Sequence, residues 1–202
     1  MPPDPWVLAF DTSAAHCAVA LLAGKTRRVC RVDSMVRGQA EHLMPMLETV
    51  LAEAGITWRD LNLIAVGTGP GNFTGIRISV AAARGLALAL AIPAIGVSGF
   101  DTLAHGQAGP LWSVIPARRG HFYARYDEGP ITGVPLQLSA PELDQLTGQK
   151  LCRTDVPAET FVENIARVSL GRADRAQPRP APLYVRPPDA APSNITAPIL
   201  LT

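Results

Sequence analysis

The sequence predicts an α/β protein built on a mixed β-sheet, and three observations lead to this prediction. The chain opens with short β-rich runs joined by tight turns, a pattern typical of antiparallel strands. Later apolar runs alternate with helical segments, which favours parallel strands connected by helices. The length of 202 residues suffices for one large domain or two small ones, because a domain averages about 150 residues.

Three strands are expected at the start of the chain. Trp6–Phe10 is a short apolar run that ends in Asp11-Thr12-Ser13, and Cys17–Ala23 follows it closely. Gly24-Lys25 has the composition of a hairpin turn, after which Arg28–Asp33 returns as a third strand. These segments therefore predict an antiparallel meander.

An amphipathic helix is expected after the meander. Its apolar residues recur at steps of three and four, as one buried helix face requires, and they are Ala40, Leu43, Met44, Leu47, Val50, Leu51 and Ala54. Gly55 is a natural end for this helix. Leu61–Thr68 and Ala94–Val97 are then expected to be buried strands on either side of a second helix.

The second helix, about Thr74 to Ala91, is apolar almost all round apart from Arg77 and Arg84. Such a helix should be covered on more than one side. One interpretation is a central helix covered entirely by this chain. The other is a flat surface on which a partner's helix can pack closely, formed by Ala81, Ala82, Ala83, Gly85, Ala87 and Ala89. The second interpretation predicts an obligate partner.

The chain changes character after Ser98, which is expected to cap a short helix. Leu111–Pro116 and His121–Asp127 resemble two strands around the turn Arg118-Arg119-Gly120. Two helices and an extended tail are expected beyond them: a helix from Ser139-Ala140-Pro141-Glu142, a helix over Thr160–Leu170, and prolines 178, 180, 182, 187, 188, 192 and 198. We therefore expect an N-terminal lobe over residues 1–105 and a smaller C-terminal lobe over 106–202.

Composition excludes several classes of protein. The net charge of +1 and the isoelectric point of about 7.8 disfavour autonomous nucleic-acid binding, because such domains usually carry a basic stripe. The cysteines are odd in number and widely separated, which argues against a disulfide framework or a zinc ribbon and fits a reducing cytosol: Cys17, Cys30 and Cys152. Residues 1–5 lack the basic start of a signal peptide, and the apolar run Gly85–Val97 is interrupted by Pro93. A soluble, cytoplasmic protein without a membrane span is expected.

The glycine-rich loop over residues 67–75 lies between an expected strand and helix. Backbone amides at such a position attract phosphate, but the spacing matches neither the dinucleotide fingerprint nor the P-loop. A structural turn capped by Thr74 is the alternative. Asp11 likewise either faces a ligand at the strand end or caps a turn through its own side chain. The possible phosphate-facing residues are Asp11, Thr12, Ser13, Gly69, Gly71, Asn72 and Thr74.

The sequence contains none of the common catalytic or metal-binding motifs that we considered. The four histidines are distant from one another and form no H-E-x-x-H or H-x-x-x-H pair: His16, His42, His105 and His121. No serine stands in a G-x-S-x-G motif. We therefore predict no catalytic residue, no metal site and no cofactor.

The assembled motifs resemble those of the TsaB (YeaZ) family, a bacterial subunit of the machinery that makes threonylcarbamoyladenosine in tRNA. The matching segments are Leu8–Ser13 with Cys17–Leu21, Gln39–Leu47, Gly69–Ile78, Gly85–Ala87, Pro93–Ser98 and Pro182–Arg186. Coverage is strong over residues 7–105 and thin over 106–180. The resemblance implies the duplicated actin-like ATPase (ASKHA) fold, with two ribonuclease-H-like lobes of which the second is reduced.

The resemblance also implies a non-catalytic role. In this family the metal and the transfer chemistry belong to a TsaD-like catalytic subunit, a TsaE-like ATPase joins the pair, and tRNA is bound only within the complex. The two helices are implied to pair with TsaD, or with a second copy when TsaD is absent. Candidates for that contact face are Leu43, Leu47, Val50, Ile76, Val80, Ala83 and Ala87.

Two competing hypotheses and one open question remain at this point. An ATP-dependent kinase of the same fold would use Asp11 and the Gly69–Gly75 loop, whereas a peptidase has no nucleophile–base motif to support it. The open question is whether four arginines contact tRNA or form a solvated face: Arg118, Arg119, Arg172 and Arg175.

Overall fold

The computed structural model describes residues 1–129 and 131–185 of the chain. Its first layer is a five-stranded mixed sheet in the order β3-β2-β1-β4-β5. The strands are β1 (Trp6–Asp11), β2 (His16–Ala23), β3 (Thr26–Ser34), β4 (Leu63–Gly67) and β5 (Ala94–Val97). β1 is antiparallel to β2 and parallel to β4, and β4 is parallel to β5. This is the ribonuclease-H-like arrangement that the resemblance implied.

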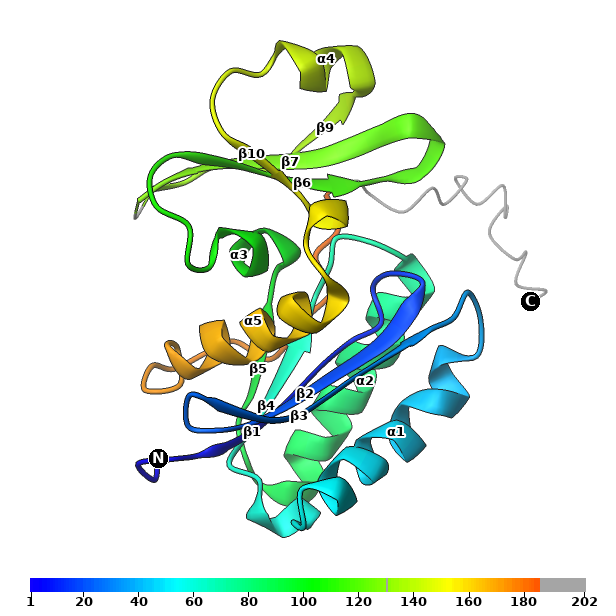
Figure 1. Ribbon diagram of the computed structural model, residues 1–202, viewed down its shortest axis with the longest axis vertical. Coiled ribbons are helices and arrows are strands. Elements are labelled where there is room, and N and C mark those ends of the chain that lie inside the picture. The colour runs from blue at the N-terminus through cyan, green and yellow to red at the C-terminus, as the bar shows by residue number, and fades with distance from the viewer. Residues whose placement is uncertain (130, 186–202) are drawn as a thin grey trace, which may run out of the picture.

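Helices cover both faces of this sheet (Figure 1). One face packs against α1 (Gln39–Glu53) and α2 (Phe73–Leu90), and the other packs against α5 (Ala158–Leu170). Along β1, Leu8 and Phe10 point into the first core, whereas Val7 and Ala9 point into the second. Because both sides of the strand are buried, β1 has a continuous apolar sequence instead of an alternating one.

A smaller second sheet lies beyond α5 (Figure 1). Its strands are ordered β10-β6-β7-β8, with β9 paired to β7: β6 (Leu111–Pro116), β7 (His121–Glu128), β8 (Ile131–Thr132), β9 (Leu136–Ser139) and β10 (Lys150–Cys152). The short helices are α3 (Gly99–Ala104), α4 (Ala140–Gln145) and the single turns η1 (Trp58–Asp60), η2 (Arg118–Gly120) and η3 (Arg153–Asp155). Ile115 and Tyr123 of this sheet pack against the same core as α5.

The α/β class and the two-lobe architecture with a reduced second lobe are confirmed. The division at residue 105 stays a prediction about independent units, and the packing of α5 on β1 and β2 shows that the later part of the chain also contributes to the first layer. Among the predicted tail prolines, Pro178, Pro180 and Pro182 lie in a segment that forms neither helix nor strand. Prolines 187, 188, 192 and 198 and Arg186 of the closing motif lie outside the described residues.

Helix α2 is not enclosed by its own chain. By length and composition it is the one helix of the described residues that a membrane could accommodate, but the core helix of a soluble protein passes the same test. Only 28% of its residues are buried, and Leu88 is 84% exposed. The interpretation in which this chain covers the helix completely is therefore wrong.

Candidate functional site

The end of β1 is folded back on itself. Asp11 is completely buried, and its Oδ2 atom accepts a hydrogen bond from Ser13 Oγ at 2.9 Å and lies 3.2 Å from His16 Nε2. The backbone amide of Ser13 also donates to Asp11 Oδ1. The carboxylate thus organises its own turn, which is the alternative that the sequence left open.

The glycine-rich loop packs directly against this strand end. Thr12 Oγ1 donates to the carbonyl of Gly75 at 2.6 Å. A Cβ atom at Gly75 would overlap the carbonyl oxygen of Thr12, and one at Gly71 would overlap the carbonyl oxygen of Ser13. Glycine is required at both positions because two chain segments touch there. These contacts favour the structural interpretation of the loop.

The cap of α2 differs from the prediction. The helix begins at Phe73, and the side chain of Asn72, not Thr74, accepts a hydrogen bond from Gly75 N at 3.0 Å. The backbone amide of Asn72 in turn donates to the backbone carbonyl of Ser13 at 2.7 Å. Asn72 therefore ties the helix start to the end of β1, whereas Thr74 is left exposed.

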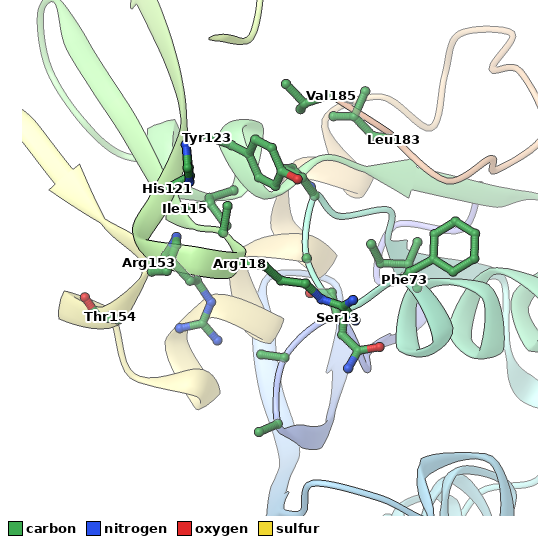
Figure 2. A pocket seen from close by; sticks show the side chains of 18 of the residues that line it. Ser13, Phe73, Ile115, Arg118, His121, Tyr123, Arg153, Thr154, Leu183 and Val185 are labelled. Atoms are coloured by element: carbon green, nitrogen blue, oxygen red, sulfur yellow. The ribbon is translucent and has the colours of Figure 1, made fainter. Parts of the chain in front are cut away.

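A cleft of about 1320 Å³ opens between the two lobes at this point. Figure 2 shows Ser13 and Phe73 from the first lobe opposite Arg118, His121 and Arg153 from the second. Of the seven predicted phosphate-facing residues, the cleft is lined by Ser13, Gly71, Asn72 and Thr74. Asp11, Thr12 and Gly69 do not line it.

The cleft is positively charged. Its lining contains Arg118, Arg119 and Arg153 and two histidines, and no lining residue is acidic. Arg153 lies 3.9 Å above the ring of Phe161 and donates through Nη1 to the carbonyl of Val156 at 2.8 Å. Burial lowers the pKa of the Arg153 guanidinium, an effect that nearby Asp11 opposes.

Sequence reasoning found only part of this cleft. Arg118 and Arg119 were recognised as a charged turn, but Arg153 and Tyr123 were not identified. They reach the cleft from η3 and β7, and nothing in the local sequence signals that these segments meet the start of α2. Of the other two arginines considered for contact with tRNA, Arg172 forms an ion pair with Asp101 at 2.9 Å.

The cleft gives little support to metal or nucleophilic chemistry. Within residues 1–129 and 131–185 no cluster of three histidine, cysteine or acidic side chains is present. Asp11, which the kinase hypothesis needs, is buried and engaged by Ser13 and His16. Burial raises the pKa of the Cys17 and Cys30 thiols to about 11, so both are poor nucleophiles at neutral pH.

A second candidate surface is the outer side of α2. The predicted contact residues Leu43, Leu47, Val50, Ile76, Val80 and Ala83 are at most 3% exposed, and Ala87 is half-buried. The first six belong to the core beneath α1 and α2 and have almost no surface to offer. The exposed residues of α2 after its first two turns are Ala81, Arg84, Gly85, Leu88 and Ala89.

Comparison with known proteins agrees with the fold. Residues 34–155 match the family model described as TsaD: tRNA N6-adenosine threonylcarbamoyltransferase. An uncharacterised protein of Mycobacterium tuberculosis is 34% identical over 209 aligned residues, which cover 92% of this chain and 94% of that protein. The tRNA threonylcarbamoyladenosine biosynthesis protein TsaB of Escherichia coli is 37% identical over 122 residues, or 58% of this chain and 52% of that protein.

Solved structures extend the similarity over most of the chain. YeaZ from Pseudomonas aeruginosa superposes with a TM-score of 0.72 at 24% identity, covering 89% of this chain and 99% of that one. A structure of an uncharacterised protein with similarity to peptidase YeaZ from Pseudomonas aeruginosa gives a TM-score of 0.69 at 25% identity, with 90% of this chain covered. Together with the family model and the relatives named TsaB, these similarities show that the chain belongs to the TsaB (YeaZ) family.

Proposed function

We propose that this protein is a non-catalytic subunit required for threonylcarbamoyl transfer to adenosine in tRNA. Its role is to stabilise and activate a TsaD-like catalytic subunit. The relatives named TsaB support the pathway. The single observation that carries the accessory role is the outer side of α2, an apolar helix face that the chain leaves uncovered although the rest of α2 belongs to its core.

The contact with the catalytic subunit uses the exposed side of α2. Ala81, Gly85 and Ala89 are small and exposed, so a partner helix can approach the α2 backbone closely. Leu88 is 84% exposed and supplies a large apolar side chain to bury. Arg84 lies among them and fits an acidic residue on the partner. The buried residues below this face hold α2 in place and do not touch the partner.

The wider assembly follows from the same role. A TsaE-like ATPase joins the pair, tRNA is engaged within the complex, and two copies of this chain associate through α2 when the catalytic subunit is absent. The protein works in the cytoplasm, where its tRNA substrate is modified. Light scattering of the pure chain, and then of its mixture with the catalytic subunit, measures both kinds of association.

Reconstitution tests the function directly. The TsaD-like subunit, the ATPase, threonylcarbamoyl adenylate and tRNA are mixed with and without this chain, and threonylcarbamoyladenosine is measured by mass spectrometry of digested tRNA. We expect modification only when the chain is present. Equal yields in the two mixtures would refute the proposal.

Ala81→Glu tests the surface, with Ala140→Glu as the matched control because Ala140 is an exposed residue of α4 in the other lobe. A glutamate at position 81 places an unpaired charge inside the contact, so affinity for the catalytic subunit should fall at least about 30-fold, or about 2 kcal/mol. The control should bind normally. Equal affinities of the two variants would move the interface away from α2.

A further inference from the structure

We propose that the cleft between the lobes binds a single-stranded segment of the tRNA substrate through its phosphates, with Arg118, Arg119 and Arg153 as the contacts. This inference deepens the proposed function and rests on it. It assigns a direct RNA-binding role to residues of this chain, in addition to its contact with the catalytic subunit.

The first argument is the pairing of the arginines. Outside the cleft, five arginines each lie within ion-pair distance of a carboxylate: Arg27, Arg31, Arg125, Arg167 and Arg172. Seven others form no such pair within the described residues, so the lack of a carboxylate partner does not by itself distinguish the cleft: Arg28, Arg37, Arg59, Arg77, Arg84, Arg175 and Arg179. For Arg118, Arg119 and Arg153 no such pair occurs with any carboxylate of residues 1–129 and 131–185. Three positive charges therefore face one cavity without a partner there. The chain's net charge of +1 conceals this local excess.

The second argument is how the charges are placed. Arg153 is held in position by its contact with Phe161 and its hydrogen bond to Val156. In Figure 2, the side chain of Arg118 extends toward Ser13 on the opposite wall. The exposed N-terminus of α2 lies on that same wall and adds partial positive charge. An extended, negatively charged backbone would therefore meet cations on both sides.

The third argument concerns the bases. Tyr123 of β7 lines the cleft, and Figure 2 shows it beside His121. It is only partly buried. Single-stranded RNA is recognised largely by stacking of its unpaired bases on aromatic rings and arginine planes. Phe73 is less suitable, because Arg77 lies 3.8 Å above its ring and Tyr184 packs beside it at 5.2 Å.

The same cleft fits a magnesium nucleotide poorly. A nucleoside triphosphate is normally held with Mg²⁺, which needs carboxylate or similar oxygen ligands, and no acidic residue lines the cleft. Gly75 does not line it, and Gly71 is packed against Ser13. The volume of about 1320 Å³ also exceeds the usual small-molecule range of about 300–1,000 Å³. A polymer loop satisfies these features better than a free nucleotide does.

The test is RNA binding by the full chain without other subunits. A fluorescein-labelled stem-loop RNA with a single-stranded, adenosine-containing loop is titrated, and anisotropy is recorded at about 50 and about 200 mM salt, the range over which phosphate contacts change affinity most visibly. The cleft variant is Arg118→Gln with Arg119→Gln; both side chains are exposed, so the fold should persist. The control is Arg28→Gln with Arg59→Gln, which removes the same charge from exposed sites outside the cleft.

We expect the cleft variant to bind about tenfold more weakly at the lower salt and to lose about 1.4 from the log–log salt slope, about 0.7 for each lost single-strand phosphate contact. The control should behave like the unmodified chain. Equal binding by both variants would overturn the inference. So would absence of binding up to about 100 µM, the weak end of non-specific affinities, or displacement of the RNA by stoichiometric ATP with magnesium, which would assign the cleft to a nucleotide.

Failure of this inference is distinguishable from failure of the proposed function. The binding experiment contains no catalytic subunit, and the reconstitution measures modification without reference to the cleft. A chain that supports modification but shows no arginine-dependent RNA binding keeps the proposed function and loses the inference. A chain that binds RNA through the cleft but is dispensable for modification loses the proposed function.

Discussion

Helices α2 and α5 cover opposite faces of the same sheet, but their outer sides differ. At one edge of α5 the partly covered side chains carry charge, because Glu163 pairs with Arg167 one turn away and with Arg27 on β3. In α2 the corresponding side carries Ala81, Leu88 and other small or apolar residues. Both helices bury their inner sides in a hydrophobic core. The chain's own stability therefore explains the composition of α5, whereas the outer side of α2 needs another explanation, and the partner proposed above would provide one.

The largest effect is expected from truncating the inner side of α5. Ile165 is completely buried, so Ile165→Ala should lower the free energy of unfolding by about 2–5 kcal/mol. Leu88→Ala, on the exposed side of α2, should change it by less than about 0.5 kcal/mol at protein concentrations low enough to keep the chain monomeric. Urea titrations of the two variants measure the contrast. A loss for Leu88→Ala as large as that for Ile165→Ala would mean that α2 is covered in solution.

Substitution of two glycines of α2 by alanine should change the stability of the chain in opposite directions. A methyl group at Gly75 overlaps the carbonyl of Thr12, so Gly75→Ala should destabilise the chain by about 1–3 kcal/mol. Gly85 has nothing within contact distance of an added Cβ, so Gly85→Ala should stabilise the helix of the monomeric chain by up to about 1 kcal/mol. Thermal unfolding of both variants tests the pair. Destabilisation by Gly85→Ala would show a close neighbour on the outer side of α2.

The α5 side also contains a charged cluster that should be sensitive to pH. Asp101 Oδ1 lies 2.7 Å from Arg125 Nη2, and Asp101 Oδ2 lies 2.9 Å from Arg172 Nη2. Burial acts to raise the pKa of the Asp101 carboxyl, but the hydrogen bonds and charges of these two arginines outweigh it and hold the pKa below its ordinary value of 3.8.

Because the folded-state pKa is depressed, the stabilisation by Asp101 is present above the ordinary pKa and is lost as the pH falls from about 4 through the folded value. Asp101→Asn should cost about 1–3 kcal/mol at neutral pH, since it leaves two arginines with fewer acceptors. Urea titrations of both proteins between pH 7 and about pH 3 should show the difference shrinking toward acid. A difference independent of pH would mean that the carboxylate charge is unimportant.

The smallest effect on stability is expected at the charged edge of α5. Glu163→Gln removes a pair between residues four apart, in which Arg167 Nε lies 3.0 Å from Glu163 Oε1, and it weakens the contact with Arg27. Such pairs contribute about 0.3–0.5 kcal/mol. Arg84→Gln on α2 should change stability even less but weaken binding to the catalytic subunit. Denaturation and binding measured on the same two variants would separate the contribution to stability from the contribution to partner binding. An unchanged affinity for Arg84→Gln would remove that residue from the interface.

The sequence predicted the first layer well, because its buried strands are continuous apolar runs and Gly55 and Gly24 mark the turns between elements. It did not predict which side of α2 faces outward. A helix that is apolar on all sides does not reveal which side faces the core. Ala83 was therefore predicted to belong to the contact face, although it is completely buried. The short strands β8 and β10 of the second sheet were not predicted, because β8 is exposed, β10 is only partly buried, and strands of two and three residues are too short to show alternation.

The cleft was harder to predict than the fold. Asp11, Thr12 and Ser13 were grouped with the glycine-rich loop, and the hydrogen bonds between Asp11 and Ser13 are local. The bond from Thr12 to Gly75 instead depends on two segments about sixty residues apart meeting at close range. Arg153 reaches the cleft only through the packing of η3 on Phe161. Such sites depend on tertiary contacts, for which a single sequence carries no local signal.

Helix α2 contributes to both surfaces described above, since its first turn lines the cleft and its later turns carry the uncovered face. Its 18 residues span about 27 Å at 1.5 Å per residue. The helix is therefore a rigid spacer. A partner docked on its last turns, as proposed above, would lie roughly one helix length from RNA bound in the cleft. A single element of this chain would then set the distance between the two.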